Sequence, residues 1–197
     1  MPLWGATDAD ESKPKHLTTA QKKEVYANAS GWVVEAGSTQ SGNGNTSATP
    51  EVLVAIGSLA TSLGSADITE IDWITTAADK SDGFSLSVRV FFNEPVDVDT
   101  GSGTPYVAIT NSNAGSGSGR GPHNLPYASG TGTNELVFTL AIAADNAATN
   151  ADDVLSVGAN AMNLNSGTIK DAGTSTNSTI TSSSAIGTAA GTITVTA

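Results

Sequence analysis

The stretch Phe84-Ser-Leu-Ser-Val-Arg-Val-Phe-Phe-Asn-Glu-Pro-Val-Asp-Val98 decides the fold class of this 197-residue chain. From Phe84 to Val90 every second residue is apolar, with Ser or Arg between, which is the period of a strand with one buried face. Shorter apolar stretches follow as far as the C-terminus, with Gly- and Pro-rich turn signals between them and no helical pattern. The sequence therefore predicts a mainly β protein whose larger part is a Greek-key β-sandwich of seven or so strands.

Charge divides the chain near residue 66. Residues 1–66 hold six acidic and four basic side chains, net −2, whereas residues 67–197 hold thirteen acidic and four basic ones, net −9. We therefore expect two parts, an N-terminal anchoring region at 1–66 and the sandwich domain at 67–197.

The N-terminal region is expected to contain an irregular arm, one short helix and a β-hairpin. Thr18 and Gln21 have the spacing of a capping box, which predicts a helix that runs through Ala27 and stops before Ser30. The β-branched and aromatic content at 31–36 and the apolar run at 51–56 predict two strands joined by a long polar loop. These elements make a poor core by themselves, so the region either packs on the sandwich or docks on a partner protein, and we favour the partner.

Two kinds of side chain in this region suit docking on a partner. Large apolar residues of the arm and helix can fill a groove, and the only basic cluster of the chain can meet an acidic strip, although a solvated basic face is an alternative. The predicted anchor residues are Leu3, Trp4, Lys13, Lys15, Leu17, Lys22, Lys23 and Tyr26.

Composition excludes several classes of function. A net charge of −11 gives no electrostatic basis for binding nucleic acid or an anionic membrane, and the absence of Cys excludes disulfides and thiolate sites. The longest apolar runs are about five residues, against the roughly 18 that span a bilayer. The N-terminus has no secretory signal, yet the Gly-, Ser-, Thr- and Asn-rich body is typical of an exposed extracellular protein. Release by lysis within a virus particle would explain both features, as would a dedicated secretion system.

Four ordered segments resemble bacterial Ig-like repeats. The run from Phe84 to Val98 is similar to the second strand of these repeats, and Gly103–Ile109, Tyr127–Phe138 and Leu164–Gly173 are similar to their later segments. One departure is Thr174, where the repeat usually ends in Gly-Asn. The resemblance implies an Ig-like sandwich at 67–197, and it leaves the function open because such modules occur both in adhesins and on phage virions.

A looser resemblance covers the N-terminal region. Leu3-Trp4-Gly5, Gly31-Trp32-Val33 and Leu53–Gly57 resemble the opening of small virion structural proteins of marine tailed phages. This implies a capsid decoration or cement protein on the virion surface, assembled in the host cytoplasm and released by lysis. Its implied partners are the major capsid protein or other virion proteins, further copies of itself, and a host-surface glycan. The alternatives are a tail or neck protein, a bacterial adhesin or surface-layer module that binds calcium, and a carbohydrate-active module.

Residues for catalysis are few, so we predict that the protein is not an enzyme. The chain has two histidines and no G-x-S-x-G nucleophile motif, and the Gly-rich stretch at 115–121 lacks the Lys of a phosphate-binding loop. We expect that stretch and the residues that follow it to be an exposed loop in which Arg120 and His123 contact a partner or a glycan.

Two acidic loops are weak candidates for calcium. Calcium takes six to eight oxygen ligands, which carboxylates in loops can supply. The candidates are Glu94, Asp97, Asp99, Asp152 and Asp153. A solvated acidic surface is the simpler interpretation, so no cofactor is predicted.

Overall fold

The computed structural model describes residue 14 and residues 17–28, 30–42, 44–55, 65–113 and 122–197. It is mainly β, with 52% strand and 7% helix, which confirms the predicted fold class. A three-stranded sheet contains β1 (Val25–Asn28), β2 (Gly31–Val34) and β3 (Glu51–Ala55). A nine-stranded sheet contains β4 (Ile68–Trp73), β5 (Ala78–Asp79), β6 (Phe84–Asp99), β7 (Tyr106–Asn113), β8 (His123–Ser129), β9 (Thr133–Ile142), β10 (Asp153–Asn163), β11 (Thr168–Asp171) and β12 (Thr192–Thr196). The described helices are α1 (Thr19–Lys23) and α3 (Ser184–Ala190).

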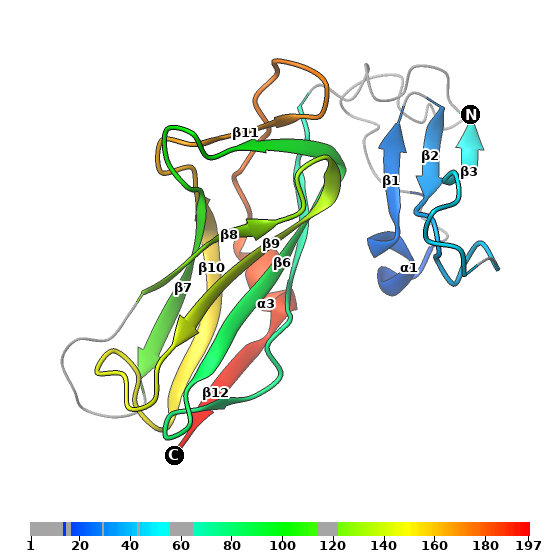
Figure 1. Ribbon diagram of the computed structural model, residues 1–197. Helices are drawn as coiled ribbons and strands as arrows, with labels where there is room; N and C mark the ends of the chain where they lie inside the picture. The colour runs from blue at the N-terminus through cyan, green and yellow to red at the C-terminus, as the bar shows by residue number, and fades with distance from the viewer. Residues whose placement is uncertain (1–13, 15–16, 29, 43, 56–64, 114–121) are drawn as a thin grey trace.

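Strand β6 organises the larger sheet (Figure 1). One edge pairs with β9, while the other pairs first with β4 and then, beyond Pro95, with β11. Leu86, Val88, Val90 and Phe92 point into the core and are completely buried, as the alternation predicts. Phe91 faces the opposite side of the sheet and is only 4% exposed, so a second layer must cover it.

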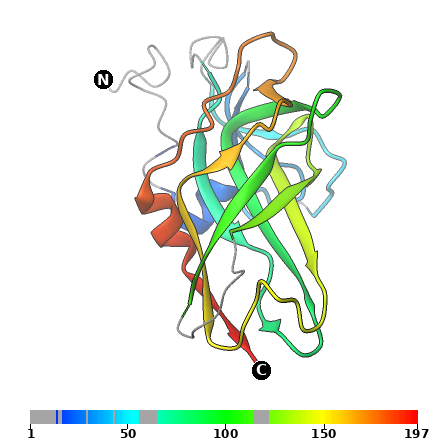
Figure 2. The same cartoon turned by 90° about the vertical axis from the view of Figure 1, so that its left-hand side faces the viewer.

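Strand β8 connects the two layers of the sandwich. Its first half pairs with β7 and its second half, from Tyr127, pairs with β9. The strand order is β11-β6-β9-β8-β7-β10-β12-β5, with β4 added on β6. Because one strand belongs to both layers, the sheet curls over a single apolar core, as Figure 2 shows in side view.

Helix α3 corrects the prediction that residues 67–197 contain no helix. Seven residues are too few for a helix that is stable by itself, so packing must hold it in place. It lies on β10 and β4, and the Trp73 indole nitrogen donates a hydrogen bond of 3.2 Å to the carbonyl of Gly191 at its end. A Cβ at Gly187 would lie 2.1 Å from the carbonyl oxygen of Val157, so only glycine allows this close contact.

Replacing Gly187 by alanine should therefore destabilise the sandwich. We expect Gly187→Ala to lower the free energy of unfolding by about 1–3 kcal/mol, as is usual for overpacking against backbone. Gly158→Ala, also at the β10–α3 side of the sandwich, is the matched control, since its Cβ would meet only Thr110 Oγ1 at 3.6 Å. Chemical denaturation of the two variants gives the comparison, and equal stabilities would contradict the packing of α3.

The N-terminal helix is shorter than predicted. The capping box of Thr18 and Gln21 is present, but α1 ends at Lys23, and the next residues form β1 instead of continuing the helix. Alternation explains the difference, because Val25 and Ala27 are buried while their neighbours are half-exposed. Pairing with β2 brings both against Trp32, and this burial outweighs local helix preference.

The three-stranded sheet has a small core of its own. Its fully buried members are Val25, Ala27, Trp32 and Val34, and Leu17 and Val54 pack against them. The predicted hairpin of the second and third strands is confirmed, since β2 pairs antiparallel with β3. A register shift leaves Leu53 as an extra residue on β3, opposite the step from Trp32 to Val33.

The segment that enters the sandwich is fixed at residues 65–67. The buried Asp171 carboxylate accepts a hydrogen bond of 2.7 Å from the backbone N–H of Ala66, whose carbonyl accepts one of 2.7 Å from Thr179. The backbone N–H of Asp67 donates to the side chain of Asn93 at 2.7 Å. The described strands of the smaller sheet all precede this point, and those of the larger sheet all follow it.

Candidate functional site

The two sheets meet at a polar seam beside β6. Lys23, at the end of α1, forms ion pairs with Glu70 at 3.4 Å and with Asp72, both on β4. Burial alone would lower the pKa of Lys23, but the two carboxylates outweigh it and raise that pKa above its usual value. Lys23, which the sequence predicts to anchor the chain to a partner, therefore forms intramolecular ion pairs with the sandwich domain.

The same seam covers the outer face of β6. Arg89 lies over the ring of Phe91 at 5.8 Å and approaches the Glu135 carboxylate at 3.7 Å. A cavity of about 300 Å³ lies between these residues and α1, and we call it the ionic pocket. Its lining residues are Ala20, Lys23, Glu24, Glu35, Asp72, Arg89, Phe91 and Glu135. We call α1 and the three-stranded sheet together the N-terminal unit. This unit thus supplies the layer that buries Phe91.

Removing the Lys23 charge should weaken the seam. Lys23→Met would leave Glu70 and Asp72 facing each other without their cation, so we expect a loss of about 1–2 kcal/mol in the free energy of unfolding. Lys80→Met is the control, because its Asp145 partner is 77% exposed and such surface pairs contribute little. Urea denaturation at low salt would test this, and an equal effect of both variants would contradict the ion-pair account.

A second cavity at the seam is also lined by Glu35. This seam pocket has a volume of about 270 Å³. Its lining residues are Tyr26, Glu35, Ala36, Thr46, Pro50, Pro95, Gly132, Thr133 and Asn134. Burial and the Glu35 charge raise the pKa of the Tyr26 phenol, so the carboxylate lies near that ring. Sequence reasoning missed Glu35 and Asn134, since nothing local indicates that segments a hundred residues apart share one cavity.

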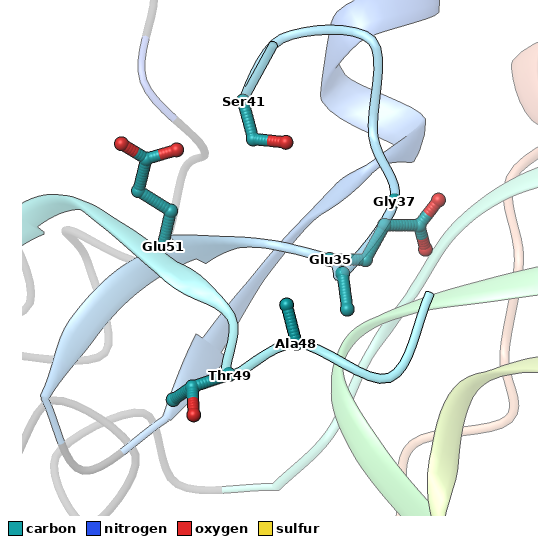
Figure 3. Close-up of a pocket in the computed structure, with 7 residues that line it drawn as sticks. Glu35, Gly37, Ser41, Ala48, Thr49 and Glu51 are labelled. Atoms are coloured by element: carbon teal, nitrogen blue, oxygen red, sulfur yellow. The ribbon is translucent and has the colours of Figure 1, made fainter. Parts of the chain in front are cut away.

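A third cavity, the loop pocket, adjoins Glu35 within the N-terminal unit. Its volume is about 310 Å³ and it is lined by Glu35, Ala36, Gly37, Ser41, Ala48, Thr49 and Glu51. Figure 3 shows the carboxylates of Glu35 and Glu51 on opposite sides of this pocket.

The predicted anchor residues separate into two groups. Leu3, Trp4, Lys13 and Lys15 lie outside the described residues. Among the others, Leu17 packs on the small core and Tyr26 lines the seam pocket, while Lys22 lies in the last turn of α1 and is partly exposed. Leu17 and Lys23 both make contacts within the chain, which supports the alternative that the N-terminal region packs on the sandwich.

The prediction of an exposed contact at His123 is wrong, and Arg120 lies outside the described residues. His123 begins β8 and is only 6% exposed, with its Nε2 atom 3.2 Å from the hydroxyl of the buried Thr149. Burial lowers the pKa of His123 below its ordinary value near 6.5, although the nearby Asp153 charge partly opposes the shift. Pairing of β8 with β7 explains the burial, since it places the His123 ring in the interior of the sandwich, at one end.

This histidine should make the fold sensitive to mild acid. The unfolded chain takes up a proton near pH 6.5, whereas folded His123 resists protonation, so stability is full above that pH and falls as the pH drops through the folded pKa. We expect His123→Gln to flatten the stability curve between about pH 5 and 7. His16→Gln is the control, and thermal unfolding across this range gives the measurement. A slope that survives His123→Gln would contradict the assignment.

The calcium candidates are not brought together as a ligand set. Asp97 accepts a hydrogen bond of 3.0 Å from Gly173, and Asp99 accepts one of 2.8 Å from Gly101. Glu94 and Asp153 are buried, whereas Asp152 is exposed. Within the ranges that the structure describes, no three His, Asp or Glu side chains are arranged to hold a metal ion.

The described helices, of five and seven residues, are too short to cross a membrane.

Comparisons with known proteins give no family for this chain. No family model, no curated protein sequence and no solved structure matches the chain.

Proposed function

We propose that the protein is a non-enzymatic structural protein of a tailed-phage virion, and specifically a decoration protein on the capsid. The observation that carries this proposal is the apolar outer strand of the N-terminal unit. Val52 and Leu53 on β3 are 45% and 38% exposed, although both are large and apolar. The register shift at Leu53 breaks the alternation, so two successive apolar side chains face solvent.

The position of β3 supports a role in docking. In the described part of the chain it pairs only with β2, and it lies at the end of the molecule away from the sandwich (Figure 1). Natural edge strands usually carry charges where they remain in water; β3 has one, Glu51 at its start, and the four residues that follow are apolar. Residues 1–66 have a net charge of only −2, whereas residues 67–197 have a net charge of −9. A capsid protein that docks on β3 therefore meets less negative charge than one that docks on the sandwich.

The structure of the chain also suits a binding role better than catalysis. At the seam, Glu70 and Asp72 are engaged with Lys23, and Glu135 with Arg89. His123 is buried against Thr149. The Ig-like sandwich would then project from the particle surface, and its negative charge would discourage association between neighbouring particles.

A capsid-binding assay tests this proposal. The particles are those encoded by the genome that carries this gene, and quantitative mass spectrometry of purified heads and tails should find the chain on heads in many copies. Added protein should bind heads that lack it, and Leu53→Lys should weaken binding by about tenfold or more, the usual effect of charging an apolar contact of this size. Ile74→Lys is the control, because Ile74 is equally exposed, at 41%, but lies on the sandwich.

Each outcome has a definite meaning. Absence of the chain from particles would reject the virion role altogether. Presence on tails alone would transfer the same role to a tail or neck protein. Equal losses with Leu53→Lys and Ile74→Lys would reject β3 as the docking strand.

A further inference from the structure

The loop that joins β9 to β10 places a buried hydroxyl beside a buried histidine. This loop lies at the end of the sandwich near the C-terminus (Figure 1). Thr149 in the loop is 1% exposed, and its Oγ1 atom lies 3.2 Å from Nε2 of His123, the first residue of β8. Such a pairing is how a base activates a hydroxyl nucleophile. Burial lowers the pKa of His123, so the ring is neutral at pH 7, and in the tautomer with its proton on Nδ1 it accepts the hydroxyl proton through Nε2.

The carbonyl group next to this hydroxyl has a hydrogen-bond donor of its own. The Asn111 side chain, on β7, donates a hydrogen bond of 3.0 Å from Nδ2 to the carbonyl oxygen of Ala148. The same nitrogen donates to the Asp153 carboxylate at 2.9 Å, and because both partners are acceptors, the orientation of the amide is fixed. A donor held on a carbonyl oxygen stabilises the negative charge that develops there when a nucleophile attacks the carbonyl carbon.

Thr149 reaches that carbonyl carbon through its own chain. The residue follows Ala148 directly, so attack by Oγ1 on the preceding carbonyl carbon closes a five-membered ring, and no separate substrate has to be bound. Thr149 and His123 are both buried, so the surface gives an external substrate no access to them. The peptide bond between Ala148 and Thr149 is therefore the bond on which these groups can act.

We propose that the chain cleaves itself between Ala148 and Thr149, with Thr149 as the nucleophile, His123 as the base and Asn111 as the oxyanion donor. Thr149 Oγ1 forms a bond to the Ala148 carbonyl carbon while its proton moves to His123 Nε2. The peptide C–N bond then breaks, and the imidazole returns the proton to the Thr149 nitrogen, which leaves an ester between Ala148 and the Thr149 side chain. Ala148 is partly exposed, so water reaches this ester and hydrolyses it to a carboxylate on Ala148 and a free hydroxyl and amine on Thr149.

Asp153 is a positioning residue in this arrangement. Its buried carboxylate accepts hydrogen bonds from Asn111 and, at 2.8 Å, from the backbone N–H of Asn150. It therefore holds the oxyanion donor in place, and its charge stabilises the imidazolium that forms on His123 during the attack. The reaction is a single event on the chain itself, so it goes beyond the proposed virion role and does not depend on it.

The two products should stay associated after cleavage. Strand β10 of the C-terminal fragment pairs with β7 of the N-terminal fragment, and β11 pairs with β6 in the same way. The cleaved protein therefore keeps the sandwich, and the fragments 1–148 and 149–197 separate only under denaturing conditions.

Incubation of the purified full-length protein tests the proposal. Denaturing mass spectrometry should find both fragments accumulating over days at neutral pH, with a summed mass one water above that of the intact chain. Sequencing of the new N-terminus should begin at Thr149. Absence of both fragments from the folded protein would overturn the proposal, and so would cleavage at another bond.

Variants identify the groups that carry the reaction. Thr149→Val removes the nucleophile at similar volume and should abolish cleavage, whereas Thr149→Ser keeps a hydroxyl and should still cleave. His123→Gln and Asn111→Ala should each slow cleavage by about a hundredfold or more. Ser182→Ala is the matched control, because it removes another buried hydroxyl, at 6% exposure, and should cleave at the original rate.

Thermal unfolding establishes first that each variant is folded. Should His123→Gln or Asn111→Ala fail to fold, the two substitutions at Thr149 still decide the question. Fragments that form equally fast in Thr149→Val would show that another agent cuts the chain and would overturn the proposal. A folded Thr149→Ser protein that stays intact would overturn it as well.

Discussion

The pairing of β6 along both edges is the constraint on which the rest of the structure depends. Its sixteen residues form one side of the core, and the strand changes partner from β4 to β11 on either side of Pro95. Proline has no N–H to donate, so it stands at the point where the ladder is interrupted. The break also lies near Asn93, whose amide oxygen holds the segment that enters the sandwich. One strand therefore sets the core, the curl of the sheet and the entry of the chain.

The outer face of β6 explains why the N-terminal unit packs where it does. Arg89 and Phe91 project from that face, and a ring that is only 4% exposed needs a cover. The covering unit makes its contacts through charge, with Lys23 on two carboxylates, rather than through a large apolar surface. Such an interface is closer to a transient protein–protein contact than to a core, and polar cavities remain within it.

Patterns within one segment were predictable from the sequence, and contacts between distant segments were not. The alternation at β6 and the capping box at Thr18 are local, and the structure has both. The length of α1 was overestimated because the buried pairing of Val25 with Val34 overrides helix preference. Helix α3 was missed because its stability depends on Gly187 meeting Val157, a contact across thirty residues. The seam pocket joins segments near residues 26, 35, 95 and 134, and no periodicity links them.

Two of the predicted anchor residues make contacts within the chain, and this changes which surface remains available to a partner. Leu17 and Lys23 have the composition of docking residues, but one completes the small core and the other holds the seam. Once they are engaged, the large apolar side chains still exposed among the described residues are Val52, Leu53 and Ile74. Two of these are consecutive and lie on an edge strand whose one charged residue is Glu51 at its start, whereas Ile74 is isolated on the acidic domain. Because isolated apolar residues are common on any surface, the pair on β3 is the stronger indication of a contact.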